Sequence, residues 1–283
     1  RISGEAAKKT GLTRQTIVAG GMFDIDACAI AMAVTKPEQL CTITGTWSIN
    51  EFISTKPLTG TDIAMNSLYA IPGFYLLEEC SATSAGNLEW VIENCVNTKA
   101  RGGSALYNEL SGLAGSISPE NSDVYYLPFL YGSNAHALAR ASFVGMTNYH
   151  TKAHMIRAVY EGVAYSHKTH IDRLLAVRSA PETVRMGGGA VNSDFWVQMF
   201  ADVLGYPVET VRGVKELGAL GCAMSALVAA GIYNDYVEAA EVMVRVGTPV
   251  EPNWRRHEIY NEKYEKYKAI VSALDTVWDR FAI

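Results

Sequence analysis

The sequence has no surplus of basic residues. Its 283 residues carry 24 Lys and Arg against 29 Asp and Glu, a formal net charge of −5, and no basic run occurs. Nucleic-acid-binding surfaces need clustered positive charge, so no nucleic-acid partner is expected. The most apolar stretch, residues 219–233, is shorter than the roughly 20 apolar residues of a membrane helix, so no membrane partner is expected either.

Cysteine is also scarce. There are five cysteines, an odd number, and they form no C-x-x-C pair. Their small or apolar neighbours predict buried thiols in a reducing compartment, with no metal site or disulfide framework. Because no targeting segment is visible, we expect a cytoplasmic protein. The chain begins at Arg1 without an initiator Met, and we expect a fragment of a longer protein.

Strand-like and helix-like stretches alternate along the chain. The longest helical pattern covers about residues 150–175, where apolar residues recur at the spacing of one buried helix face. The alternation predicts an α/β fold, and no linker divides the chain. A buried strand is predicted at residues 16–23. Further strands are predicted at residues 40–44, resumed at 47–50, and at 124–130, 182–186 and 207–211, and further helices at residues 26–34, 87–96, 104–113, 193–204, 217–228 and 260–281.

Three glycine-bearing junctions follow predicted strands, where open α/β sheets place ligand clefts. The first junction, residues 20–24, brings Asp24 and Asp26 beyond the strand at residues 16–23. A carboxylate at this place can accept a proton from a substrate hydroxyl, as phosphoryl transfer requires. It can equally cap the following helix, and each Asp could take one of the two roles.

The other two junctions favour anion and nucleotide binding. At Gly45 an anion can approach the backbone amides and Thr46 adds a hydroxyl, although Gly45 could instead mark a β-bulge. At residues 187–189 the glycines leave a flat surface before a helix N-terminus. The alternative there is a tight turn capped by Asn192 or Ser193. Neither a G-x-G-x-x-G fingerprint nor a Walker loop occurs.

Six motifs, in order, resemble the carboxy-terminal half of the FGGY carbohydrate kinases. They are GMFD at residues 21–24, TGT at 44–46, SAGNLEW at 84–90, RAVYEGVA at 157–164, GGGAVNSDFW at 187–196 and ELGALGCA at 216–223. The resemblance covers nearly the whole chain. The pairing of FDIDA at residues 23–27 with GTWS at 45–48 is closer to the L-xylulose and 3-keto-L-gulonate kinase branch than to the glycerol kinases.

This resemblance implies a fold and an activity. The fold would be a ribonuclease-H-like, actin-type ATPase domain with a mixed sheet flanked by helices. Residues 1–283 would form the carboxy-terminal kinase domain, and the amino-terminal sugar-binding domain would be absent from this chain. The implied reaction is the phosphorylation of a sugar hydroxyl, on a ketopentose such as L-xylulose or a keto-sugar acid, with ATP and Mg²⁺. The resemblance leaves a homodimer open.

Site residues follow from the same resemblance. Asp24 matches the general base of the pattern G-x-x-D-x-x-A, because Ala27 stands at the required spacing. Gly218 and Gly221 would allow close helix packing. Many relatives carry Gly-Glu-Arg where this chain has Gly-Ser-Asn at residues 132–134. The expected ATP-binding residues are Gly45, Thr46, Gly86, Gly188, Gly189 and Ser193.

Other interpretations are carried beside the kinase. One is a nucleotide-binding or assembly module without independent catalytic activity, and another is an actin-fold ATPase that regulates a partner. His167 lies on an apolar stripe and is expected to be a satisfied core residue. Glu78, Glu79 and the lysines at residues 263–268 are expected on solvated faces.

Overall fold

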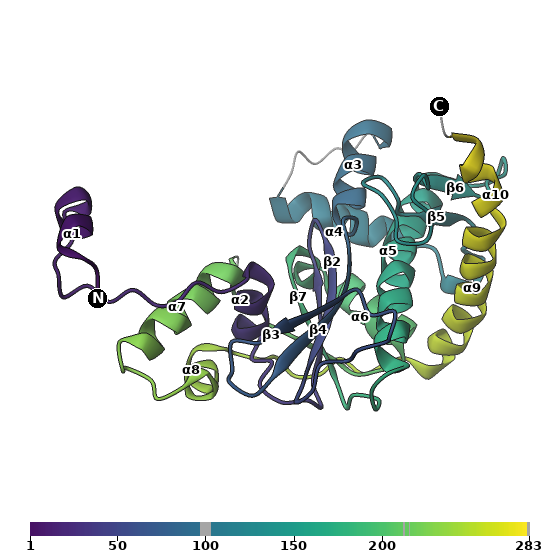
Figure 1. Ribbon diagram of the computed structural model, residues 1–283. Helices are drawn as coiled ribbons and strands as arrows, with labels where there is room; N and C mark the ends of the chain where they lie inside the picture. Colours follow the sequence, from purple (N-terminus) through teal and green to yellow (C-terminus); the bar gives the residue numbers. More distant parts are fainter. Residues whose placement is uncertain (97–102, 212, 215, 282–283) are drawn as a thin grey trace.

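A six-stranded mixed sheet forms the centre of the molecule in the computed structural model, which describes residues 1–96, 103–211, 213–214 and 216–281 (Figure 1). The spatial order is β3-β4-β2-β1-β7-β8. β1 pairs antiparallel with β2 and parallel with β7, and β7 pairs parallel with β8. The strands are β1 (Leu40–Thr44), β2 (Ser48–Ser54), β3 (Met65–Leu68), β4 (Tyr75–Ser81), β7 (Val184–Gly187) and β8 (Val208–Thr210).

Helices cover both faces of this sheet. On one face α2 and α7 pack against each other over a core that includes Ile30, Ile53 and Met224. On the other face α5 crosses the sheet over a larger core that includes Tyr160 and Phe200. The predicted α/β class, with a mixed sheet flanked by helices, is confirmed. The principal helices are α2 (Asp24–Ala31), α5 (Lys152–Leu175), α6 (Asp194–Leu204), α7 (Leu217–Ala229) and α9 (Trp254–Ala273).

Shorter elements complete the molecule. β5 and β6 form a separate two-stranded sheet, and β5 ends directly before Pro128, which has no N–H to donate to a strand partner. No helix among the described residues is long and apolar enough to cross a membrane. These elements are α1 (Gly4–Thr10), α3 (Gly86–Cys95), α4 (Gly103–Gly115), η1 (Pro119–Asn121), β5 (Tyr125–Leu127), β6 (Ser142–Val144), η2 (Gly189–Asn192), α8 (Tyr236–Met243), α10 (Asp275–Trp278) and η3 (Asp279–Phe281).

Helix ends follow local capping rules. Ser193 caps α6 by accepting a hydrogen bond from the Trp196 amide, and Gly205 ends the helix in the left-handed conformation at φ 73°, which confirms the predicted boundaries. The last long helix begins earlier than predicted, because the Asn253 side chain accepts from the Arg256 amide and caps it there. It ends at Ala273, and the shorter α10 and η3 follow.

The strand predicted at residues 16–23 is wrong. This segment pairs with no strand of the described sheet, and Ile17, Val18 and Phe23 are 41%, 65% and 43% exposed. An apolar, β-branched pattern indicates a strand only when a neighbouring strand satisfies its N–H and C=O groups. In this structure the segment is an extended lead into α2.

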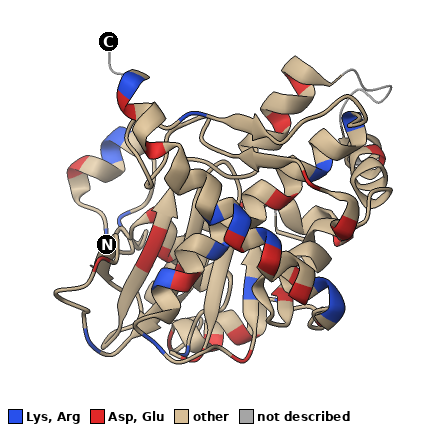
Figure 2. Cartoon of the chain, turned by 90° about the vertical axis from the view of Figure 1, so that its right-hand side faces the viewer, with Lys and Arg blue, Asp and Glu red and all other residues tan. Residues whose placement is uncertain are grey.

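The expectation that Glu78, Glu79 and Lys263 are solvated is also wrong. Figure 2 shows acidic residues on the strands of the sheet. Glu78 is 1% exposed, and Glu79 is fully buried. Lys263 is 5% exposed and forms an ion pair with buried Glu161 at 2.5 Å. A buried charge is tolerated where a partner neutralises it, and the partner of Lys263 comes from a distant part of the chain.

The cysteines are all free, but burial was predicted correctly only in part. Cys41 is buried, Cys28 and Cys80 are partly buried, and Cys95 and Cys222 are exposed. Apolar neighbours in the sequence do not decide which face of a helix a residue occupies. Cys95 and Cys222 lie on outward positions of α3 and α7.

Candidate functional site

A cleft of about 500 Å³ opens where β1 and β7 end. Its walls come from the turn after β1, the start of α3 and the η2 segment after β7. Because β1 and β7 are parallel, their carboxyl ends meet at one edge, which is the usual place for a ligand in an open α/β sheet. Five of the six predicted ATP-binding residues line this cleft: Gly45, Thr46, Gly86, Gly189 and Ser193.

Gly45 and Thr46 form the hairpin turn between β1 and β2. The register of β1 and β2 runs without an extra residue to the pair of Thr44 with Ser48, so Gly45 lies in the turn and not in a bulge within the strands. The Gly45 amide donates to the Trp47 carbonyl at 3.3 Å. The Gly45 carbonyl accepts from the Ala85 amide at 2.9 Å, which joins this turn to the start of α3. A Cβ on Gly45 would meet no described atom within 4 Å, so the backbone here is open to an incoming group.

Gly188 is the sixth predicted residue, and it supports the cleft from behind. Its φ is 87°, and a Cβ would lie 2.6 Å from the Thr44 carbonyl oxygen. Only glycine fits this close approach between the ends of β1 and β7. Gly188 is not among the described residues that line the cleft, whereas Gly189 is, and a Cβ on Gly189 would meet no described atom within 4 Å.

Ser193 serves structure and lines the cleft at once. Its hydroxyl accepts from the Trp196 amide at 3.2 Å and shares a hydrogen bond with the Ser111 hydroxyl at 2.9 Å. The capping interpretation is therefore confirmed for Ser193. Asn192 instead donates from its side-chain amide to the Gly189 carbonyl at 3.1 Å, which stabilises the η2 turn.

Asp24 lies exposed in the first turn of α2. One carboxylate oxygen accepts from the Ile25 amide at 3.0 Å. Beyond the other end of α2, the Met32 and Ala33 carbonyls accept from Arg185, near the start of β7. The N-terminal end of α2 is therefore directed toward the edge where β1 and β7 end. Asp24 is at the cleft edge of the sheet but is not among the described residues lining the cleft.

Asp26 has a different environment, two residues further along α2. It is 4% exposed, and its Oδ1 has no hydrogen-bond partner among the described residues. Burial raises the pKa of Asp26 to about 6. The helix-capping alternative is wrong for both carboxylates, because the N-cap residue of α2 is Phe23 and no side chain makes the cap hydrogen bond.

Two more carboxylates are buried beneath α2. Glu51 of β2 and Glu78 of β4 stand opposite each other in the sheet. Burial raises the pKa of both, and the Cys41 thiol donates to Glu51 at 3.1 Å. Within the described ranges, no three His, Cys, Asp or Glu side chains are grouped to hold a metal ion. These carboxylates were not predicted, because burial of Glu in a strand leaves no signal in the sequence.

His167 connects strands β1 and β2 to the segment that precedes α3. Its Nδ1 lies 2.8 Å from the Thr42 hydroxyl and 2.9 Å from the Asn50 side-chain oxygen, and its Nε2 lies 2.8 Å from the Ser84 hydroxyl. Burial lowers the pKa of His167 to about 3, so the ring is neutral. The prediction of a satisfied core histidine is confirmed. The network holds Ser84 two residues before Gly86.

Sequence reasoning missed several lining residues. Tyr107 reaches the cleft from α4, Trp196 from α6, and Glu216 from the residue before α7. Glu89 lies one helical turn after Gly86 and is 3.5 Å from the Tyr107 hydroxyl. The SAGNLEW and ELGALGCA motifs contained Glu89 and Glu216, but only the fold shows that these carboxylates face the same space.

The chain belongs to the FGGY family of carbohydrate kinases, and residues 40–230 match the C-terminal domain of that family. It is 34% identical over 274 residues to the L-xylulose/3-keto-L-gulonate kinase of Escherichia coli K12, covering 96% of this chain and 53% of that protein. It is 32% identical to a protein named probable L-xylulose kinase in Pasteurella multocida, covering 96% and 54%. The predicted resemblance, including its branch, is confirmed.

A solved structure gives the same fold. The crystal structure of xylulose kinase from Rhodospirillum rubrum superposes with a TM-score of 0.84 at 25% identity, covering 98% of this chain and 56% of that one. The predicted ribonuclease-H-like, actin-type fold is confirmed. The chain spans about half the length of the curated relatives it matches.

Proposed function

We propose that residues 1–283 form the nucleotide-binding, carboxy-terminal domain of an ATP-dependent sugar kinase. The observation that supports this most directly is the convergence of Gly45, Thr46, Gly86, Gly189 and Ser193 on one cleft at the ends of β1 and β7. The substrate would be a ketopentose such as L-xylulose or a related keto-sugar acid, in line with the names of the relatives. Most sugar contacts would come from an amino-terminal domain.

In this proposal the cleft holds ATP through backbone and hydroxyl groups. The open Gly45 backbone and the Thr46 hydroxyl would bind the terminal phosphate, and the flat surface at Gly189 would lie against the nucleoside. Oriented amides stabilise phosphate charge without a lysine, which fits a chain of net charge −5. Mg²⁺ would bind mainly through the phosphates and water and would neutralise charge on them, since it takes few protein ligands in kinase sites.

Asp24 would act as the general base. It would accept the proton of the sugar hydroxyl as that oxygen bonds to the γ-phosphorus, and the bond from γ-phosphorus to ADP would break. The exposure of Asp24 at the free end of α2 supports this role, because a substrate held by another domain can reach it. Asp26 is buried and unavailable for direct contact.

The test is Asp24→Asn in the full-length enzyme. We expect kcat to fall by about two to four orders of magnitude, with ATP affinity nearly unchanged. Asp62→Asn is the matched control, since Asp62 is an exposed carboxylate in the loop between β2 and β3. Turnover near the normal rate in Asp24→Asn would overturn the assignment.

A second candidate is a nucleotide-binding or assembly module without its own activity. It is favoured by the fact that Asp24 is not among the described residues that line the cleft. Calorimetry with ADP, together with a turnover assay on this chain, separates the two candidates. ADP binding without ATP turnover supports the module, and sugar-dependent ATP turnover supports the kinase.

The five free cysteines fit a reducing compartment, and we propose that the enzyme is cytoplasmic.

A further inference from the structure

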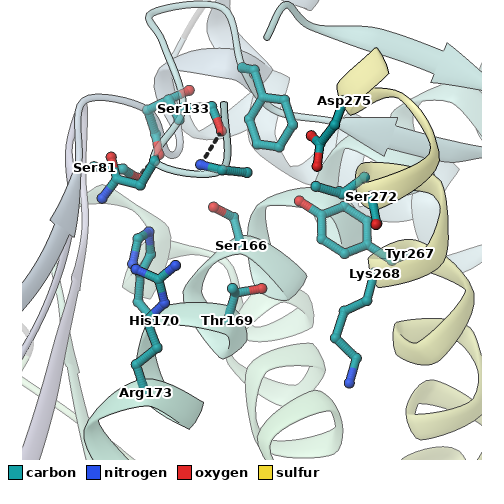
Figure 3. A pocket seen from close by; sticks show the side chains of 15 residues that line it. Ser81, Ser133, Ser166, Thr169, His170, Arg173, Tyr267, Lys268, Ser272 and Asp275 are labelled. Carbon is teal, nitrogen blue, oxygen red and sulfur yellow. Dashed lines mark hydrogen bonds between the residues drawn. The ribbon is translucent and has the colours of Figure 1, made fainter. Parts of the chain in front are cut away.

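A second cavity lies between α5, α9, α10 and the end of β4 (Figure 3). Its volume is about 180 Å³, and none of the described residues lining it also lines the nucleotide cleft. One water occupies about 30 Å³, so this space equals about six waters. That is room for a small metabolite, and too little for a nucleotide.

Hydroxyl groups recur along a lining whose surface is otherwise mostly apolar. Seven of the 15 lining side chains carry a hydroxyl, among them Ser133, Ser166, Thr169 and Tyr267. The Phe129 and Tyr267 rings supply apolar surface beside these groups. A ligand pocket typically combines aromatic walls with a few placed polar groups that fix orientation. This combination suits a molecule with several hydroxyls on a short carbon chain.

Two polar groups at the α9–α10 end are left without partners. Asp275 Oδ1 is buried with no hydrogen bond among the described residues. Tyr267 is 3% exposed, and its hydroxyl makes no hydrogen bond within the described part of the chain; in Figure 3 it points into the cavity. A buried polar atom without a partner costs about 1–3 kcal/mol, and a ligand hydroxyl donating to Asp275 would remove that cost.

The basic side chains near the cavity already have carboxylate partners. His170 Nδ1 lies 3.1 Å and the Arg173 guanidinium 3.4 Å from the same oxygen of buried Glu79. Lys268 forms an ion pair with Glu265 at 2.8 Å, and in Figure 3 its amine is directed away from the cavity centre. Asp275 Oδ1 has no partner, and the described lining leaves no basic side chain without a carboxylate partner that could attract an anion. A neutral ligand that donates hydrogen bonds fits better.

The cavity is joined to the nucleotide cleft by one short turn. Ser81 and Thr83 line the cavity, and Ala85 and Gly86 line the cleft. Between them, the Ser84 hydroxyl is held by His167 Nε2 at 2.8 Å. A ligand that orders Ser81 and Thr83 therefore acts on the segment that positions Gly86.

We propose that this cavity is a binding site for a neutral polyhydroxylated molecule of about five carbons, such as a pentitol. The site is distinct from the nucleotide cleft. Because the turn at residues 81–86 is common to both, the ligand and ADP would change each other's affinity by the same factor, as linkage requires. Binding itself is independent of the proposed kinase activity, whereas the linkage depends on ADP binding in the cleft.

The experiment is a titration of this chain with xylitol, in which NMR signals of the Tyr267 and Phe129 rings report binding. A second titration uses inorganic phosphate as the charged probe. We expect xylitol to bind and to shift these rings. Tyr267→Phe and Asp275→Asn should each weaken binding about tenfold, the worth of one buried hydrogen bond. Tyr236→Phe is the matched control, since its hydroxyl bonds to Ser225 on the other face of the sheet.

Each result of this experiment either supports or overturns the proposal. Xylitol affinity unchanged in both Tyr267→Phe and Asp275→Asn overturns the proposal, and so does binding of phosphate in place of xylitol. Asp24→Asn should bind xylitol as the wild type does, and a loss there would place the ligand at the candidate catalytic edge instead. Thermal unfolding of each variant confirms that a lost signal reflects binding. An absence of ADP binding would remove the linkage and the proposed function, and leave the xylitol result standing.

Discussion

Gly221 of α7 packs directly against the backbone of Ala27 in α2. A Cβ on Gly221 would lie 2.0 Å from the Ala27 carbonyl oxygen and 2.7 Å from the Ala27 Cα. Two helices can approach this closely only where one has no side chain at the contact. Since α2 carries Asp24 in its first turn, this contact fixes where the candidate base stands relative to the cleft.

Gly221→Ala is therefore expected to destabilise the chain. Either the helices separate or the added methyl overlaps backbone, and overpacking of this kind costs about 1–3 kcal/mol. Gly218→Ala is the matched control, because its Cβ would meet only the Cys28 sulfur at 3.8 Å. Relief of the helix cost of glycine should leave Gly218→Ala neutral or about 0.5–1 kcal/mol more stable. Urea unfolding of both variants checks this, and equal effects at the two positions would contradict it.

The same pair shows how far the sequence could predict the fold. Close packing at Gly221 was expected from the family motif, and the alternating strand and helix patterns located β1, β7, α5 and α6. Local patterns succeed where the periodicity of one element decides its burial. They failed at residues 16–23, because a strand also needs a neighbour that the described sheet does not provide.

Buried charges were beyond prediction for a related reason. Glu79 is hydrogen-bonded to His170, and Lys263 is paired with Glu161, over separations of 91 and 102 residues. Nothing near either residue in the sequence marks the partner. The glycines of the candidate site were predicted because motif and geometry agree there, whereas Tyr107 and Glu216 reach the cleft only through helix packing.

His167 is expected to make the fold sensitive to acid. Burial lowers its pKa from 6.5 to about 3, so the unfolded chain binds a proton that the folded chain excludes. Stability should then fall as the pH decreases below 6.5, by about 1.4 kcal/mol per unit. His167→Gln loses bonds to Thr42, Asn50 and Ser84 and should be less stable at pH 7.5 by about 2–4 kcal/mol.

The deficit of His167→Gln should shrink by about 2 kcal/mol between pH 7.5 and pH 5, because only the wild type carries the histidine penalty. Urea unfolding at the two pH values measures it. His136→Gln, at a partly exposed position paired with Asp279, serves as the control. A deficit that stays constant over this range would refute the role of the neutral ring.

Asp26 should make the stability of the fold depend on pH in the opposite direction to His167. Burial raises its pKa from 3.8 to about 6, so the folded chain keeps a proton that the unfolded chain releases. Stability contributed by Asp26 is full below pH 3.8 and is lost as the pH rises to 6. Asp26→Asn removes the charge at nearly constant shape, and its stability relative to the wild type should rise by about 2 kcal/mol between pH 4 and pH 7.

Asp62→Asn, at an exposed carboxylate, is the control for this comparison. The same unfolding curves are recorded for both variants at pH 4 and pH 7. If Asp26→Asn and the wild type differ equally at the two values, Asp26 does not titrate in the folded chain within this window. Activity should be affected far less than in Asp24→Asn, because Asp26 lies on the buried face of α2.

Substitutions at Gly188 and Gly189, in the same turn, should affect different properties, namely stability at Gly188 and nucleotide binding at Gly189. At Gly188 the φ of 87° and the 2.6 Å approach to the Thr44 carbonyl forbid a side chain, so Gly188→Ala should lower stability by about 2 kcal/mol or more. At Gly189 a Cβ meets no described atom within 4 Å and extends into the cleft. Gly189→Val should therefore fold normally and fill part of the space proposed for the nucleotide.

The measurements are urea unfolding and calorimetry with ADP on both variants. Gly189→Val should unfold within about 0.5 kcal/mol of the wild type and bind ADP at least tenfold more weakly, because the added methyl groups occupy the flat surface that glycine leaves open. Gly188→Ala should lose stability first, and its ADP affinity should follow from the displaced turn. Normal ADP binding by Gly189→Val would exclude this turn from the nucleotide site, and the proposed position of the nucleoside with it.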